Sequence, residues 1–252
     1  MTLTRAATAA TAAAPAAPAG PRRNDPAQYD ELADQWWEPR GSFAGLHWLA
    51  GARAANVPPA LRPNALLVDV ACGGGLLAPH LAGRGYRHLG VDLSPTAVRV
   101  AREHGVTPVR GNVARLPVAS GAADVVVAGE ILEHVPDLPG VVGELARVLR
   151  PGGVLVIDTI ARTWFARIGA ITVAERLPAG PPKLLHDATL FVDRGELRRE
   201  CARHGIRLEL TGLRPSLRDY LGWLVGRRSG VRMLRTRNTA ALFQGVGVKE
   251  PG

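Results

Sequence analysis

The sequence predicts an α/β protein built on a doubly wound, mostly parallel sheet of seven strands. Short apolar segments rich in Val, Leu and Ile alternate with segments of helical spacing, which is the pattern of strand–helix–strand units. A turn of small residues, Ala71 to Gly75, closes the first strand. The strands expected from this pattern are 66–70, 89–91, 107–110, 123–129, 154–159, 206–213 and 240–248.

The composition fits one domain of this kind. A chain of 252 residues can bury an ample α/β core. It contains no run of about 18 apolar residues, so we expect no membrane-spanning helix. Cys72 and Cys201 lie far apart and lack the spacing of metal ligands, and we expect both to be reduced thiols of a cytoplasmic protein.

The N-terminal part of the chain divides by composition. Residues 1–25 are rich in Ala, Thr and Pro, which predicts a disordered tail rather than a targeting peptide. The ordered domain is expected to span 26–249 and to begin with helices in 26–57. These helices carry an aromatic cluster from Trp36 to His47, which is either a lid over a ligand or a helix packed on the core.

Two segments, 160–192 and 214–238, interrupt the alternation of strands and helices, and we expect them to face a substrate or a membrane. The second segment also concentrates charge. The chain has a net charge of +9, and the stretch from Arg214 to Arg237 contains seven arginines and one acid. This patch predicts an anionic partner, either lipid headgroups or nucleic acid. Beside the patch lies an apolar stripe with helical spacing: Leu217, Tyr220, Leu221, Leu224 and Val225. This stripe either dips into a membrane or packs on the core.

The first two strands predict a nucleoside cofactor. Glycines in the turn after Val70 lack Cβ atoms, so the backbone can pass close under a ligand. The second strand ends in Asp92, an acid placed to accept hydrogen bonds from ribose hydroxyls. The turn reads Asp69-x-Ala71-x-Gly73-x-Gly75, which resembles motif I of the class I methyltransferases that use S-adenosylmethionine (SAM). A dinucleotide fingerprint, Gly-x-Gly-x-x-Gly, has another spacing.

Asn112 and Val113 extend the expected cofactor site at the end of the third strand. The methyltransferase pattern has Asp where Asn112 stands, bonding the adenine amino group. The side-chain oxygen of Asn can still accept that hydrogen bond.

A candidate reaction centre follows the fourth strand, at Glu130, Glu133 and His134. The i, i+3, i+4 spacing would place all three on one side of a helical turn, next to the cofactor. Two carboxylates and an imidazole suit a divalent cation, which would orient a phenol oxygen and lower its pKa. Glu133 and His134 could instead act as a base or as structural hydrogen-bonding groups, since Leu-Glu-His-Val also follows this strand in methyltransferases that need no metal.

From Tyr29 to Lys249 the chain resembles the ubiquinone-biosynthesis O-methyltransferase family. The shared motifs are Leu32-Ala33-x-x-Trp36-Trp37, Gly41-x-Phe43-x-x-Leu46-His47, the glycine turn, Glu130-x-x-Glu133-His134-Val135-Pro136-Asp137, Pro151-Gly152-Gly153, His186-Asp187 and Thr211-Gly212-Leu213. The chain departs from the family at Ala71, Asn112, Leu184-Leu185 and 214–237.

The resemblance implies a class I methyltransferase (Rossmann-like) fold with an inserted helical segment, and methylation of a catechol-type polyprenyl phenol. It implies SAM as cofactor, with Arg53 pairing with its carboxylate, and a divalent cation, Mg²⁺ or Mn²⁺, bound by Glu130, Glu133 and His134. His186 would be a further ligand or base, or only a loop histidine. The remaining cofactor residues implied are Ala71, Asp92 and Gly129.

The favoured function is therefore a SAM-dependent O-methyltransferase acting on a lipid-tailed phenol. We expect it in the cytoplasm, at the inner face of an anionic membrane. An alternative is an RNA ribose 2′-O-methyltransferase, because Glu-x-x-Glu-His also occurs in such enzymes. No aromatic-basic RNA-binding module is present, so nucleic acid is disfavoured as a partner. A second alternative is a non-catalytic SAM-binding protein, which would not need Glu133 and His134.

Overall fold

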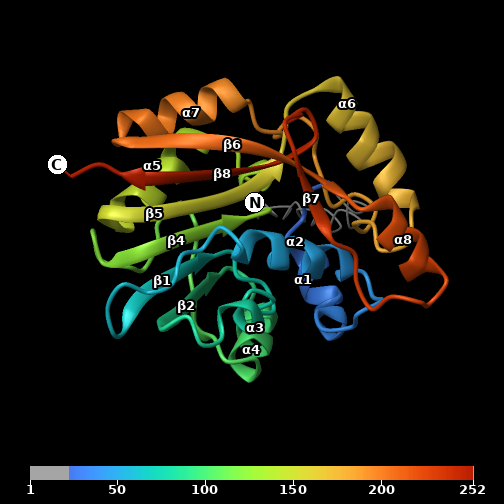
Figure 1. Ribbon diagram of the computed structural model, residues 1–252, viewed down its shortest axis with the longest axis horizontal. Coiled ribbons are helices and arrows are strands. Elements are labelled where there is room, and N and C mark those ends of the chain that lie inside the picture. Colours follow the sequence, from blue (N-terminus) through green and yellow to red (C-terminus); the bar gives the residue numbers. More distant parts are fainter. Residues whose placement is uncertain (1–22, 252) are drawn as a thin grey trace, which may run out of the picture.

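An eight-stranded sheet runs through the molecule in the order β3-β2-β1-β4-β5-β8-β6-β7 (Figure 1). This computed structural model describes residues 23–251. The first five strands are parallel, and the other three pair antiparallel with their neighbours. The strands are β1 Ala65–Val70, β2 Tyr86–Asp92, β3 Thr107–Arg110, β4 Ala123–Gly129, β5 Leu149–Ile160, β6 Ile206–Pro215, β7 Met233–Thr236 and β8 Leu242–Lys249.

The predicted fold class is confirmed, with one strand more than expected. All seven expected segments form strands, and β7 is the addition, in a segment predicted to be an insertion. It pairs with Gly212–Pro215 at the end of β6 and lies at the edge of the sheet. Its four residues, Met-Leu-Arg-Thr, are too short to show the alternation that identifies a half-buried strand.

Helices cover both faces of the sheet. On one face, α5 and α7 pack over the central strands through Val141, Leu145, Leu197 and their neighbours. On the other face, α2 and α3 bury Ala54 and Leu81 against β1 and β4. The helices are α1 Ala27–Glu31, α2 Ala44–Ala54, α3 Ala78–Leu81, α4 Pro95–Glu103, α5 Leu138–Val148, α6 Trp164–Arg167, α7 Arg194–Arg203 and α8 Leu217–Leu224.

Side-chain caps fix where the longer helices begin. Ser94 accepts a hydrogen bond from the amide of Ala97, and Pro95 takes the first helical position of α4. Asp137, Asp193 and Ser216 cap α5, α7 and α8 in the same way. None of the helices within residues 23–251 is long and apolar enough to cross a membrane.

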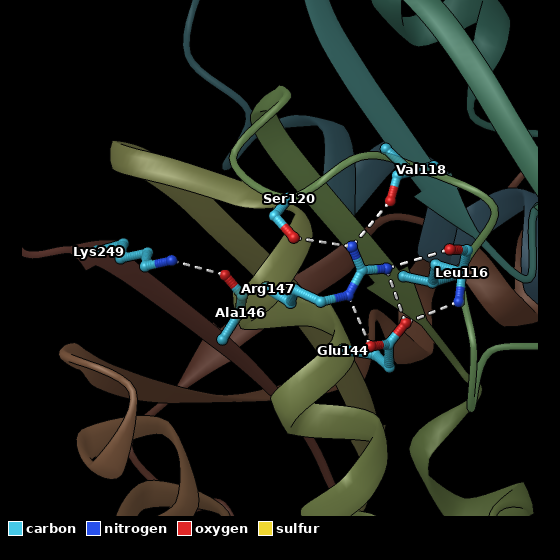
Figure 2. Close-up of polar contacts among 7 residues, drawn as sticks. All are labelled: Leu116, Val118, Ser120, Glu144, Ala146, Arg147 and Lys249. Carbon is cyan, nitrogen blue, oxygen red and sulfur yellow. Dashed lines mark hydrogen bonds and ion pairs between the residues drawn. The ribbon is translucent and has the colours of Figure 1, made fainter.

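Arg147 on α5 holds the loop that leads from β3 to β4 (Figure 2). Its guanidinium donates to the carbonyls of Leu116 and Val118 at 3.1 and 2.9 Å. Glu144 pairs with this guanidinium and accepts a hydrogen bond from the amide of Leu116 at 2.8 Å. Because the loop begins at Asn112, this network fixes one border of the expected cofactor site.

Residues 1–22, most of the predicted tail, lie outside the described part of the chain. Residues 23–25 were also assigned to that tail, yet they are bonded to the domain. The amide of Asn24 donates to the carbonyl of Leu184 at 2.9 Å. Ordered structure therefore starts at least as early as Arg23.

Candidate active site

A cavity of about 830 Å³ opens at the carboxyl ends of the parallel strands. In a doubly wound sheet this is where ligands bind, because the loops that leave neighbouring strands diverge there. Most of the sequence-predicted site residues line the cavity: Arg53, Asp69, Ala71, Gly73, Asp92, Asn112, Val113, Gly129, Glu130, His134 and His186.

The glycine turn and Asp92 are joined by hydrogen bonds. The carboxylate of Asp92 accepts from the amide of Gly73 at 2.8 Å and from the amide of Ser94 at 2.9 Å. Burial raises the pKa of Asp92. Asp69 is bonded to the ring of His88 at 3.1 Å. The end of β1 and the end of β2 thus form one continuous polar edge of the cavity.

Two small residues of the turn have specific structural roles. Ala71 has φ +56°, a left-handed backbone that costs a non-glycine residue energy, which explains why glycine is usual at this position of the motif. Gly75 does not line the cavity. A Cβ there would lie 2.9 Å from Cγ2 of Val106 and 3.2 Å from Cα of Ala101 on α4, so the missing side chain allows the turn to pack beside this helix.

The aromatic cluster is both packed and part of the cavity wall. Trp36 is buried, and its ring stacks on Phe43 with centroids 4.1 Å apart. The same ring covers the glycine turn, since a Cβ on Gly73 would lie 2.5 Å from Cη2 of Trp36. Trp37 donates a hydrogen bond to the carbonyl of Gly74 at 2.9 Å. The bare backbone of the turn therefore accommodates Trp36 on this side.

Arg53, which is expected to pair with the cofactor carboxylate, lines the cavity and is held there by an acid. Its Nε and Nη2 donate to the two oxygens of Asp158 at 2.8 and 2.7 Å, and both side chains are buried. The guanidinium crosses Gly129, where a Cβ would lie 1.8 Å from Cζ. Of the three guanidinium nitrogens of Arg53, only Nη1 has no hydrogen-bond partner among the described residues. Nη1 and the second hydrogen of Nη2 are therefore left for a ligand carboxylate.

Glu130 and Glu133 are both buried, but their surroundings differ. Glu130 has φ +50°, and its backbone amide donates a hydrogen bond to the carbonyl of Asp158 on β5 at 2.9 Å. Burial holds the pKa of Glu130 well above the usual range, and the negative charge of the nearby Glu133 adds to this effect. Glu133 accepts a hydrogen bond from Oγ1 of Thr159 at 2.7 Å, and burial raises its pKa to about 7.

The structure brings a further candidate ligand to the expected cation site. Within residues 23–251, the group with one ligand atom each inside 4.8 Å consists of Glu133, His134 and His186, the last from the distant 160–192 segment. Glu130 is outside this group; it has a left-handed backbone and precedes a 3₁₀ turn, η2 (Leu132–His134). Its buried Oε1 has no hydrogen-bond partner among the described residues, so the expected set of Glu130, Glu133 and His134 stays a prediction.

The two histidines lie face to face and are neutral near pH 7. Their ring centroids are 5.2 Å apart. Burial lowers the pKa of His134 to about 3 and that of His186 to about 4. Oε1 of Glu133 and Nδ1 of His186 are buried without a hydrogen-bond partner among the described residues. Unpaired buried acceptors beside neutral imidazoles can bind a cation or a polar hydrogen of a substrate.

Sequence reasoning missed three residues of this site. Asp158 interrupts an apolar strand, and a buried acid in such a strand is a signal that could have been followed. Tyr29 stacks edge-on to His134, and burial and the charges of Glu133, Glu130 and Asp92 raise its pKa. Asn24 bonds to His134 from a segment whose composition gives no signal.

A mostly parallel sheet with a glycine turn and an acid at the end of β2 is typical of class I SAM-dependent methyltransferases, and comparisons with known proteins support this class. Residues 68–157 match the family model described as "Methyltransferase domain". Solved SAM-dependent methyltransferases share the fold. One from Thermotoga maritima has a TM-score of 0.60 at 17% identity, covering 88% of this chain and 97% of that one. Another from Aquifex aeolicus has a TM-score of 0.51 at 15% identity, covering 89% and 98%.

More similar relatives narrow the class to one family. The ubiquinone biosynthesis O-methyltransferase of Thiobacillus denitrificans is 36% identical over 196 residues, covering 74% of this chain and 84% of that protein. The protein of the same name from Cupriavidus pinatubonensis is 35% identical over 201 residues, covering 75% and 81%. The chain belongs to the ubiquinone biosynthesis O-methyltransferase family and is a SAM-dependent O-methyltransferase.

Proposed function

We propose that the enzyme methylates a hydroxyl of a lipid-tailed catechol or hydroxyquinol. The observation that carries this proposal is the shape of the cavity. It runs from Asp92, past His134, to an apolar end between the two inserted segments. That end is lined by Ala166, Ala170, Leu177, Leu217 and Met233. The polar ring of a lipid-tailed phenol would fit the polar end of the cavity, and its apolar tail would fit the apolar end between the two inserted segments.

SAM would lie over the glycine turn, with its ribose at Asp92 and its adenine near Asn112 and Val113. Its sulfonium methyl would then point toward Glu133 and His134. As the acceptor oxygen forms its bond to the methyl carbon, the bond from carbon to sulfur breaks, and the hydroxyl proton must leave. Neutral His134, which lines the cavity, and the ionised fraction of Glu133 are the groups able to take that proton.

Glu133, His134 and His186 would also hold a divalent cation. Their mutual spacing and the unpaired atoms of Glu133 and His186 fit such an ion. When bound, a cation at this position supplies Lewis-acid polarisation of the acceptor oxygen. One carboxylate and two imidazoles suit Mn²⁺ better than Mg²⁺.

Exposed apolar side chains on both insertions support docking to an anionic membrane. Trp164 and Phe165 are 75% and 52% exposed at the start of the first insertion. Leu217 and Leu221 on α8 are 67% and 54% exposed. Tyr220 of α8 donates to the carbonyl of Pro178, so the two insertions are adjacent. An apolar tail could then pass from the bilayer into the cavity between them.

The arginine patch is partly used inside the protein. Arg228 and Arg232 pair with buried Asp219 at 3.2 and 2.6 Å, and Arg235 bonds to Asn56. Arg214, Arg218, Arg227 and Arg237 remain exposed and without an ion-pair partner among the described residues. These four are the ones expected to meet lipid headgroups.

The acceptor is tested by incubating the protein with methyl-labelled SAM and either short-chain catechols, a quinol extract or RNA. Labelled catechol methyl ether, lost in Glu133→Gln, is the expected result. Transfer to RNA ribose with no catechol product would establish the alternative. A cation requirement is tested separately, by loss of turnover in chelator and recovery with Mn²⁺ or Mg²⁺.

Membrane docking is tested with vesicles containing anionic lipid. The double variant Trp164→Ser, Phe165→Ser should no longer sediment with them, whereas Leu61→Ser, which changes an 89% exposed residue away from both insertions, should bind as before. Turnover of a short water-soluble catechol should survive in both variants. Equal sedimentation of both would show that the insertions do not face the bilayer.

A further inference from the structure

The segment before α1 contacts both His134, in the turn after β4, and His186, in the 160–192 segment. Asn24 donates from Nδ2 to the carbonyl of His134 at 3.0 Å, and its Oδ1 lies 2.5 Å from Nδ1 of the same residue. Arg23 donates to the carbonyl of His186 at 2.9 Å. One short stretch of chain therefore fastens the turn after β4 to the loop that carries His186.

The two contacts of Asn24 fix where His134 carries its hydrogen. A carbonyl oxygen can only accept, so the Asn24 atom that faces it must be the amide nitrogen, and Oδ1 must face the ring. Oδ1 can only accept as well, so Nδ1 of His134 must donate. The neutral imidazole ring has only one N–H hydrogen, so Nε2 carries a lone pair and no hydrogen. Within residues 23–251, Nε2 of His134 has no hydrogen-bond partner.

We propose that Asn24 is a positioning residue that holds His134 in the Nδ1–H tautomer, so that Nε2 is the nitrogen available to the acceptor hydroxyl or to a cation. This rests on the proposed function for what Nε2 does. The tautomer itself follows from the contacts of Asn24 alone. A partner that fixes the tautomer of a functional histidine commonly affects function as strongly as 10–100-fold.

The residue type suits both demands of the position. Asn24 has φ +59°, a left-handed backbone that asparagine adopts more readily than most residues. Glycine would fit this backbone equally well but would lack the amide. The backbone amide of Asn24 bonds to Leu184 whatever the side chain is, so the segment has an anchor independent of His134. Removal of the side chain therefore separates positioning from tethering.

Histidine-ring ¹⁵N NMR of the full chain, without SAM and with chelator, measures the tautomer directly. The chain has seven histidines, and the resonances missing in His134→Gln assign the ring. The wild type should carry its hydrogen on Nδ1. Asn24→Gly should shift His134 toward the Nε2–H form, and Asn24→Asp, which keeps an oxygen acceptor, should retain Nδ1–H. Asn64→Gly, at an exposed asparagine with φ +56°, is the matched control and should change nothing.

Kinetics then connect the tautomer to turnover. With a water-soluble catechol, kcat of Asn24→Gly should fall about 10–100-fold while SAM affinity is unchanged, and Asn24→Asp should recover much of the loss. A wild-type His134 with its hydrogen on Nε2, or an Asn24→Gly protein with an unchanged tautomer, would overturn the assignment. If the wild type shows Nδ1–H but methylates no catechol, the assignment stands and the proposed acceptor fails.

Discussion

Arg53 pairs with both carboxylate oxygens of Asp158, and this buried contact joins α2 to the central strand β5. The guanidinium passes directly over Gly129 at the end of β4. Three segments that border the cavity therefore meet at one ion pair. The contact fixes α2 to the sheet and leaves Nη1 of Arg53 without a hydrogen-bond partner among the described residues.

Replacement of Asp158 by Asn should strongly destabilise the fold. Arg53 would remain buried without the charge of its ion-pair partner, which costs about 3–5 kcal/mol when one partner of a buried pair is removed. Urea unfolding measures this loss. The exposed pair of Arg99 and Glu103 is the control, and Glu103→Gln should cost less than about 1 kcal/mol. Equal effects of the two substitutions would contradict the importance of burial.

Ala71→Gly should stabilise the protein. The left-handed backbone at Ala71 costs about 1–2 kcal/mol, and the greater chain entropy of glycine offsets about 0.5–1 kcal/mol of the gain. A net increase of roughly 0.5–1 kcal/mol in unfolding free energy is expected, with SAM bound at least as tightly. Ala78→Gly, in the helical backbone of α3, should instead lose stability. A loss in both variants would show that φ does not limit position 71.

Asp92→Ala should weaken SAM binding by about 1–3 kcal/mol, because a buried acceptor is lost. Calorimetry with SAM measures the change. The amides of Gly73 and Ser94 also lose their acceptor, so thermal stability should fall in the same variant. Unchanged SAM affinity in a folded Asp92→Ala protein would exclude this residue from the cofactor site.

The wild type should lose stability relative to Glu133→Gln as pH rises. Burial raises the pKa of Glu133 from its usual 4.5 to about 7, so the folded state binds this proton more tightly than the unfolded state. Stability then declines between pH 4.5 and about 7. Urea unfolding in chelator at pH 5, 6, 7 and 8 should show the gap between the two proteins widening. Parallel curves would mean that Glu133 is ionised throughout.

The central sheet was predictable because its strands are buried on both faces. Val125, Val126 and Val127 of β4 have almost no exposed surface, and such strands read as continuous apolar runs. Residues that follow the parallel strands, such as Asp92, line the cavity because the carboxyl ends of these strands meet at one edge of the sheet. The edge strand β7 has half-exposed side chains and an arginine, so its sequence carries no such signal.

The reaction centre was predictable in composition but not in geometry. The spacing of Glu130, Glu133 and His134 was treated as an α-helical turn, whereas Glu130 has a left-handed backbone and the other two lie in a 3₁₀ turn. Contacts made across long stretches of chain were hidden as well. Asn24 is 110 positions from His134, and no local pattern predicts which loop returns to which site.

The sheet direction also has a practical consequence for handling the enzyme. Lys249 at the end of β8 donates to the carbonyl of Ala146 (Figure 2) and to that of Leu149, beside the amino end of β5. The cavity opens at the opposite end of that strand, where Ile160 lines it. Arg23 and Asn24, in contrast, lie against the two histidine loops. An affinity tag or fluorescent fusion should therefore follow β8, because a group attached near residue 23 would lie next to the cavity.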